Sequence, residues 1–198
     1  MYLKPSIPIS KLLLWLKEEQ LAGAPDPHSA VLATVAAGAM PHSRVVAIRE
    51  INDQGLLFFT QKHTRKVSEI ESNPHASLTF WLELKERQVC IDGEIEPLSY
   101  QENESYWLTY PRFSQIRFTA YAPTSGQPIQ SKSILEANKL AIEKDFQNIP
   151  VPFNPLYCGY RIKPKRFIFY AYRTDELSDV SEYTKQNEEN WRQQIISP

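Results

Sequence analysis

The sequence predicts a mainly β protein, an antiparallel barrel with helices added at its rim. Three observations predict this fold class. Roughly six to eight segments alternate apolar and polar residues with the period of two that is typical of half-buried strands. Turn-forming residues such as Asn-Asp-Gln-Gly at 52–55 separate the first of these segments. Helix-capping signals fall outside the strand segments, so the helices are expected as additions to a β framework.

Length and composition indicate one domain, expected over residues 1–198, with a buried core. Of the 198 residues, 42% are hydrophobic. Lys and Arg together number 22 and Asp and Glu 23, a balance that gives no general attraction to nucleic acid or to an anionic membrane. The apolar run at 12–16 is too short to span a bilayer, and no signal-peptide cleavage site follows it. We therefore expect a cytoplasmic protein.

No metal site and no disulfide framework are expected. The two cysteines, Cys90 and Cys158, show neither CxxC nor Cys/His metal spacing. The four histidines lie near expected turns and have no partner at metal spacing. Two thiols in a reducing compartment are the simplest interpretation.

The first expected element is a helix at about residues 11–21. Ser10 can cap it, Leu12, Leu16 and Ala22 give it an apolar face, and Gly23 ends it. Strands are then expected at residues 30–36, 43–51, 56–60, 78–84, 88–95, 157–162, 166–172 and 190–196.

Three more helices are predicted from their capping residues. Thr64 can cap residues 65–72, and Ser99 with Glu102 forms a capping box for a helix to about residue 109. Ser133 with Glu136 fits a second box, for a helix to about residue 146. In the strand at 78–84, Leu78, Phe80 and Leu82 share one face, and we expect that face to be exposed as an apolar dimer interface.

The most informative cluster occupies residues 60–66, where a strand end meets a helix start. Three cations and two hydroxyls crowd this turn. A helix N-terminus adds free backbone N–H groups and a partial positive charge, so the cluster suits a phosphate. A solvated basic loop on a surface helix is the alternative.

Two arginines, Arg44 and Arg49, bracket the strand at 43–51. Guanidinium groups suit bidentate recognition of phosphate and imide oxygens. Five positions apart in a regular strand, the two side chains point to opposite faces, so one ligand can meet both only if the strand twists or bulges. Surface ion pairing is the alternative.

Two further segments carry polar groups suited to a ligand. Gln88 leads an apolar strand and can hydrogen-bond a heterocycle, unless it is an exposed strand end. Residues 106–115 offer two phenols, a guanidinium and a hydroxyl, although an amphipathic helix end with aromatic core residues explains the same pattern.

Taken in order, these clusters resemble the pyridoxamine 5′-phosphate oxidase family from about Leu12 to Pro198. The shared order and spacing of the matching segments carry the resemblance. The matching segments are residues 44–49, 55–60, 64–66, 86–89, 111–116 and 191–198.

The resemblance implies an FMN-binding split β-barrel, with two FMN sites at the interface of a homodimer and a C-terminal dimerisation-type segment at about 157–198. It assigns FMN phosphate contacts to Arg44, Arg65 and Lys66, and flavin contacts to Gln88 and Tyr170. The residues matched to cofactor contacts are Arg44, Val45, Arg49, Phe59, Thr60, Arg65, Lys66, Gln88 and Tyr170. Those matched to substrate contacts are Arg49, Tyr106 and Ser114, and no catalytic residue is assigned.

The departures from the family concern mainly the substrate. Tyr110 stands where the oxidases carry an arginine, and an insertion falls near residues 123–127, where the family has a Gln-Ser flavin contact. The family's C-terminal Arg-Leu-His-Asp-Arg reads here as residues 176–180, with Glu176, Ser178 and Val180 at the three contact positions.

The resemblance implies an FMN-dependent oxidoreductase that passes a hydride from a small substrate to the flavin, with O2 as the acceptor. The substrate is expected to differ from pyridoxine or pyridoxamine 5′-phosphate. A non-catalytic flavin- or haem-binding protein on the same barrel is the alternative.

Overall fold

The computed structural model describes residues 6–36, 38–187 and 190–198. Residue 37, between the strands expected at 30–36 and 43–51, and residues 1–5, 188 and 189 lie outside these ranges. The contacts divide the chain into two compact units, which are described separately. The barrel unit comprises residues 1–58, 69–96 and 160–198, and the helical unit comprises residues 59–68 and 97–159.

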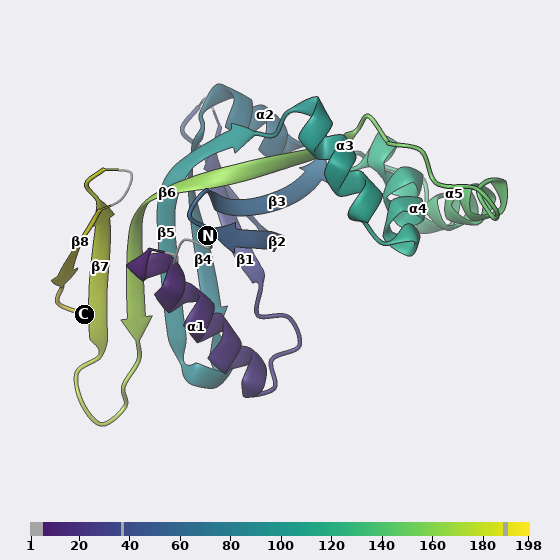
Figure 1. Cartoon of the computed structure of the whole chain (residues 1–198). Helices are drawn as coiled ribbons and strands as arrows, with labels where there is room; N and C mark the ends of the chain where they lie inside the picture. Colours follow the sequence, from purple (N-terminus) through teal and green to yellow (C-terminus); the bar gives the residue numbers. More distant parts are fainter. Residues whose placement is uncertain (1–5, 37, 188–189) are drawn as a thin grey trace, which may run out of the picture. The chain divides into compact units, whose positions relative to one another are not determined.

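Eight antiparallel strands form one sheet in the order β3-β2-β1-β4-β5-β6-β7-β8. An additional pairing of β3 with β6 closes the first six strands into a barrel (Figure 1). The expected fold class is therefore confirmed. The strands are β1 (Ser29–Val35), β2 (Pro41–Asn52), β3 (Gly55–Gln61), β4 (His75–Leu82), β5 (Arg87–Pro97), β6 (Tyr157–Ala171), β7 (Asp179–Lys185) and β8 (Trp191–Ile195).

The expected exposed face of β4 is instead the inside of the barrel. Leu78 and Phe80 are both 0% exposed, because closure of the sheet turns their side of the strand inward. The opposite face of the sheet carries exposed apolar side chains, among them Val45 at 67% and Trp81 at 53%. The assignment of Leu78, Phe80 and Leu82 to an interface was therefore wrong. Neighbouring residues of a strand point to opposite faces of the sheet, and the other set is the exposed one.

Helix α1 (Ile7–Leu21) begins four residues before the expected start at Lys11. Pro8 in its first turn has the fixed φ that suits a helix start, a signal the sequence analysis missed. Leu12 and Leu16 are buried as expected, whereas Ala22 is exposed. Trp15 packs edge-on against Phe169 of β6, with ring centroids 5.2 Å apart.

Strand β6 is one strand of 15 residues, where the sequence suggested two. Lysine, proline and arginine at 163–166 interrupt its apolar pattern. Cross-strand ion pairs with β5 accommodate these charges, since Lys163 lies 3.2 Å from Glu96 and Arg166 lies 3.1 Å from Asp92. The sequence also missed β7, which hydrogen-bonds to β6 along residues 166–171.

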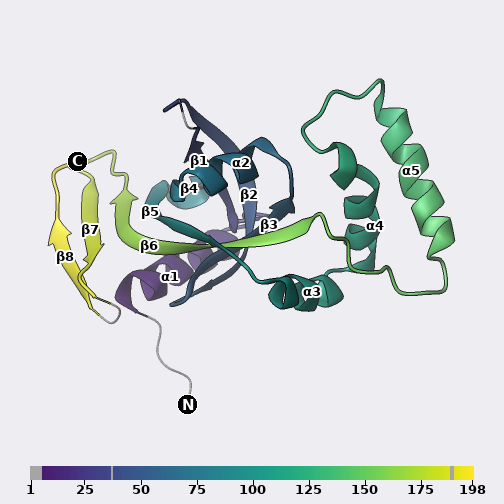
Figure 2. The same cartoon turned by 90° about the horizontal axis from the view of Figure 1, so that it is seen from above.

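The helical unit contains α3 (Tyr100–Thr109), α4 (Arg112–Tyr121) and α5 (Lys132–Asp145), with α4 and α5 side by side (Figure 2). The Ser99–Glu102 capping box is confirmed. The second box is wrong, because α5 follows Ser131 and the Ser133 hydroxyl pairs with that of Ser131 at 2.6 Å. The expected helix end at 106–115 is two helices interrupted at Pro111, and both pack around a core centred on Trp107.

Helix α2 (Arg65–Ser72) has the expected bounds, with Val67 and Ile70 buried. Short 3-10 turns occupy Glu83–Lys85 and Ala122–Thr124, so Leu84 leaves the β4 strand and is exposed. None of the helices in the described ranges combines the length and the apolar character that a membrane crossing requires.

Candidate functional site

The turn from β3 into α2, in the helical unit, is tied together by side chains. Lys66 Nζ donates to Thr60 Oγ1 at 2.9 Å, and Thr60 is only 3% exposed. Thr64 Oγ1 donates to the Gln61 carbonyl at 3.0 Å. Arg65 is exposed at the first position of the helix. The structure therefore brings Thr60 and Lys66 together, and it leaves the Arg65 guanidinium accessible at a helix N-terminus.

In the barrel unit, Arg44 of β2 is fixed by groups that the sequence did not reveal. Its guanidinium donates to Thr34 Oγ1 and, at 3.0 Å, to Glu69 Oε2. The other carboxylate oxygen of Glu69 lies 2.6 Å from His42 Nδ1. Glu69 is 4% exposed and Thr34 0% exposed, so the guanidinium is anchored on a buried acceptor pair. The buried carboxylate therefore fixes the position of the Arg44 guanidinium.

The charge state of Glu69 follows from its contacts. Burial acts to raise the pKa of its carboxyl, but hydrogen bonds donated by Thr34, Arg44 and His42 outweigh burial and hold the pKa below its ordinary value. The carboxylate is therefore ionised at neutral pH. An ionised, buried Glu69 keeps Arg44 in one rotamer.

The other two predicted residues of β2, Val45 and Arg49, are exposed. The register between β2 and β3 shifts between Ile48 and Glu50, so Arg49 occupies a β-bulge. This is the irregularity that the strand needed for Arg44 and Arg49 to reach one ligand.

Gln88 and Tyr170 lie on β5 and β6 of the barrel unit. Gln88 Nε2 donates to Cys90 Sγ at 3.1 Å and pairs in register with Trp81 of β4. Tyr170 packs on Tyr172 with centroids 4.4 Å apart, and Tyr172 meets Trp81 edge-on at 5.5 Å. Trp81 is an exposed aromatic neighbour of the predicted site residues that the sequence analysis did not select.

The helical unit holds the remaining predicted residues. Phe59 stacks on Tyr157 at 4.7 Å and meets the ring of Tyr106 at 5.1 Å. Ser114 of α4 is buried. Phe59 and Tyr106 therefore belong to the aromatic core of this unit.

A polar group beside this core was also missed. Gln61 Nε2 donates to the Tyr121 hydroxyl at 3.0 Å, and the Ser125 hydroxyl donates to Gln61 Oε1 at 3.1 Å. These bonds link β3 to the segment 121–125, next to the place where the sequence suggested an insertion. Their partners lie 60 and 64 residues apart in the chain, so no local pattern could have paired them.

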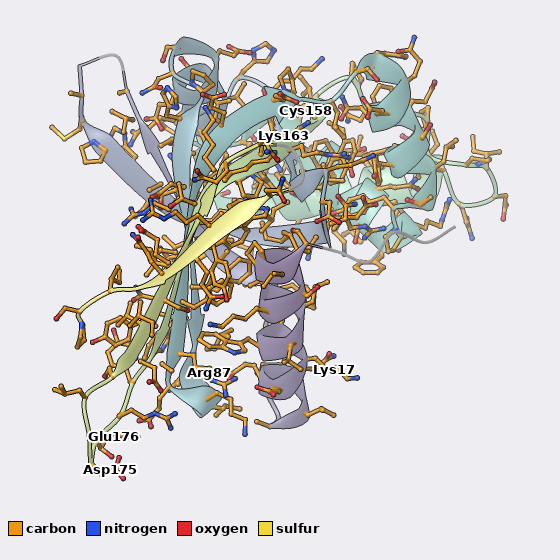
Figure 3. The ribbon with its side chains drawn as sticks, turned by 60° about the vertical axis from the view of Figure 1, so that its left-hand side comes forward. Lys17, Arg87, Cys158, Lys163, Asp175 and Glu176 are labelled. Atoms are coloured by element: carbon orange, nitrogen blue, oxygen red, sulfur yellow. The ribbon has the colours of Figure 1, made fainter. Side chains whose placement is uncertain are left out.

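The altered C-terminal positions lie in the β6–β7 loop and β7. Glu176 is exposed near the tip of the loop, as Figure 3 shows, and lies 3.7 Å from Arg173. Ser178 Oγ accepts a hydrogen bond from the Arg173 backbone N–H at 3.2 Å. Val180 is 4% exposed, in the apolar interior. None of these three positions presents a cation.

The residues present fit the phosphate of a flavin nucleotide. In the helical unit, an exposed guanidinium, an ammonium and a helix N-terminus at the start of α2 are donor types that hold phosphate groups. In the barrel unit, the anchored guanidinium of Arg44 is a donor of the same type. In the described part of the chain, no group of three or more His, Cys, Asp or Glu side chains is arranged to hold a metal ion.

Comparison with known proteins assigns the family. A family model described as pyridoxamine 5′-phosphate oxidase matches residues 16–144, and one described as the pyridoxine 5′-phosphate oxidase C-terminal dimerisation region matches residues 157–198. The pyridoxine/pyridoxamine 5′-phosphate oxidase of Alteromonas mediterranea is 35% identical over 98% of this chain and 90% of the relative. That of Bordetella pertussis is 36% identical over 96% of this chain and 89% of the relative.

Solved structures agree with this assignment. PhzG from Burkholderia lata 383, determined in complex with tetrahydrophenazine-1-carboxylic acid, has a TM-score of 0.85 and 26% identity, covering 98% of this chain and 94% of that protein. An FMN-binding, pyridoxamine 5′-phosphate oxidase-related protein from Nostoc punctiforme has a TM-score of 0.72 at 19% identity over the full length of both chains, a likeness of fold. The chain therefore belongs to the pyridoxamine 5′-phosphate oxidase family of flavin-dependent oxidoreductases.

Proposed function

We propose that this protein is an FMN-dependent oxidase that removes a hydride from a small substrate and uses O2 as the final acceptor. The observation that carries the proposal is the basic turn at the start of α2, where Lys66 is fixed to Thr60 and Arg65 is exposed. A terminal phosphate is the group that this turn is built to bind. Because the chain belongs to this family, we propose that the phosphate is that of FMN.

Each protein group has a distinct task in this proposal. Arg44, Arg65 and Lys66 bind the FMN phosphate, and Glu69 holds Arg44 in position. Val45, Phe59, Thr60, Gln88 and Tyr170 are the proposed contacts to the rest of the cofactor. Bound FMN would supply the hydride acceptor, and the protein orients the substrate and shapes the electrostatics. Arg49, Tyr106 and Ser114 are the proposed substrate contacts.

The substrate proposed is not a phosphate ester of the pyridoxine type. Two family cations are replaced by Glu176 and Ser178, and each lost charge-assisted hydrogen bond removes about 1.5–3 kcal/mol. Loss of both hydrogen bonds corresponds to about 3–6 kcal/mol of binding free energy, or roughly a hundredfold to ten-thousandfold loss of affinity. Arg112 offers no replacement, because it donates to the Phe146 and Ile149 carbonyls. The PhzG relative binds a reduced tricyclic carboxylic acid, which makes a ring with one carboxylate the preferred substrate class.

A homodimer is part of the proposal. The C-terminal 42 residues, 157–198, match a dimerisation region, and the outer barrel face carries the exposed apolar side chains Val31, Val45 and Trp81. A contiguous exposed apolar face usually marks an interface. Sedimentation of the flavin-loaded protein at the mass of one 22.9 kDa chain would contradict the dimer.

The absorbance spectrum and the mass of the copurifying molecule test the cofactor. We expect FMN, bleached by a reductant and restored by air, and a colourless Arg65→Ala/Lys66→Ala variant. Lys62→Ala removes an exposed cation from the same turn and should stay yellow. Unchanged FMN affinity in the double variant would refute the phosphate assignment, and a Soret band would favour the haem-binding alternative.

Steady-state kinetics test the substrate class. We expect tetrahydrophenazine-1-carboxylate, or a similar reduced ring acid, to be oxidised with a higher kcat/KM than pyridoxine 5′-phosphate. The double variant Glu176→Arg/Ser178→His should raise kcat/KM for the phosphate ester; Val180 stays unchanged because it is buried. Native turnover of pyridoxine 5′-phosphate at about 10⁴ M⁻¹s⁻¹ or more would show that the altered segment does not decide the substrate.

A further inference from the structure

A groove of about 750 Å³ lies in the barrel unit, between α1, the start of β5, the β6–β7 hairpin and the C-terminal residues. This volume is in the range of sites for small organic molecules. Its walls include the aromatic side chains of Trp15 and Phe169. No residue that the family resemblance assigns to the FMN phosphate lines it.

Lys11 is the central cation of this groove. Its ammonium lies 5.2 Å from the Trp15 ring and 4.5 Å from the Phe169 ring, and it donates to the neutral Ser181 hydroxyl at 2.8 Å. Among the residues that the structure describes, no carboxylate forms an ion pair with it. A half-buried ammonium held by neutral groups is an open position for an anion.

The two arginines around the groove already have carboxylate partners, and Lys85, which also lines the groove, is exposed to solvent. Arg87 stacks 4.6 Å above the Trp15 ring and is paired with Glu18. Arg173 donates to Asp179 at 3.0 Å. The carboxylates that could have balanced Lys11 are therefore occupied by arginines, and positive charge remains in excess at the groove.

The electrostatics of Lys11 agree with this imbalance. Burial lowers the pKa of its ammonium, the Arg87 guanidinium lowers it further, and the more weakly acting Asp179 opposes both. Two cations thus share the faces of Trp15 without a full counter-charge. A bound anion would remove this repulsion.

We propose that the groove binds a small aromatic acid, with its carboxylate on Lys11 and its ring against Trp15 and Phe169. Lys11 is half-buried and Lys85 is exposed to solvent. A single half-buried ammonium calls for a single negative charge, which favours a carboxylate over a phosphate dianion. The aromatic walls select a planar ring, since flat apolar surfaces pair with flat apolar surfaces. The groove contains none of the proposed FMN contacts, although Ser178 and Val180, two of the altered family contact positions, line it. The proposal rests on Lys11 and the aromatic walls and does not depend on the proposed function.

Titration calorimetry on the purified full-length protein tests the site, with 1-naphthoate as the probe and its neutral methyl ester and inorganic phosphate as comparisons. Naphthoate should bind, the ester roughly tenfold or more weakly, and phosphate without measurable heat. Lys11→Met should weaken naphthoate roughly tenfold or more, and Lys11→Arg should retain binding. Lys17→Met is the matched control, because Lys17 projects from the opposite side of α1 from Arg87 (Figure 3) and does not line the groove.

Each outcome decides the proposal. Equal binding of acid and ester, equal binding by the Lys11→Met and Lys17→Met variants, or no binding of naphthoate would overturn it. Retained naphthoate binding in the flavin-free Arg65→Ala/Lys66→Ala variant would place the acid outside the flavin site, and loss of binding in that variant would assign it to the flavin site. A circular dichroism melt of Lys11→Met shows that any loss is not due to unfolding, and the Lys11→Arg rescue is the second check.

Discussion

Replacement of Glu69 by glutamine is expected to lower the free energy of unfolding by about 2–4 kcal/mol. The buried carboxylate accepts hydrogen bonds from Thr34 and Arg44 and contacts His42. Glutamine keeps the size of the side chain but removes the negative charge, so Arg44 is left half-buried without its anion. For a chain of this length the change corresponds to a fall in Tm of roughly 4–16 °C.

Thermal unfolding by circular dichroism at neutral pH measures the effect. Glu71→Gln is the matched control, because Glu71 is exposed on the same helix and its substitution should change Tm by no more than about 1 °C. A Glu69→Gln variant as stable as the Glu71→Gln variant would refute the idea that Glu69 anchors Arg44.

The pH dependence of stability checks independently that the negative charge of Glu69 stabilises the folded protein. The pKa of Glu69 in the folded protein lies below the ordinary carboxyl value of 4.5. Its contribution to stability is therefore complete above that value and is lost as the pH falls through the lower, folded-state pKa. The gap in stability between the native protein and Glu69→Gln should be constant near neutral pH and should close in acid. A gap that persists unchanged into strong acid would assign the stabilisation to packing rather than to charge.

Two further substitutions test the framework of the fold. Gly93→Ala should destabilise the barrel by roughly 1–3 kcal/mol, because an added Cβ would lie 2.3 Å from the Lys163 carbonyl oxygen; unchanged urea unfolding would contradict this contact. Ser99→Ala should cost about 1 kcal/mol, since it removes the acceptor for the Glu102 N–H in the capping box of α3; a Tm equal to that of the native protein would show that the cap is dispensable.

Local patterns predicted the parts of the fold that depend on local physics. The alternation in β5 and the bounds of α2 follow from side-chain periodicity and capping. The burial of Leu78 and Phe80 could not be assigned to the correct face, because only the β3–β6 pairing, far from β4 in the sequence, decides which side is enclosed. The charged strand β6 was divided in two because its ion-pair partners lie on β5.

In the candidate site, too, local features could be predicted from the sequence and long-range contacts could not. The basic turn at 60–66 could be selected because its cations and its helix start are neighbours in the sequence. The anchor of Arg44 could not, since Thr34 and Glu69 lie 10 and 25 residues away from it in the chain. Lys11 and Ser181, which meet at the groove, are 170 residues apart.

Pairing rather than composition determines where this protein can accept an anion. Its 22 Lys and Arg residues are balanced by 23 Asp and Glu residues. Several of these cations form ion pairs within the chain, such as Arg44 with Glu69 and Arg173 with Asp179. A guanidinium that is paired with a carboxylate still offers oriented N–H donors to a ligand. It offers little net positive charge, because the carboxylate cancels much of its electrostatic potential. Arg65 and Lys11 are among the cations that form no ion pair within the described residues, as is the exposed Arg49 of β2. We therefore expect anionic ligands at the start of α2 in the helical unit, and at Arg49 and in the groove beside α1 in the barrel unit.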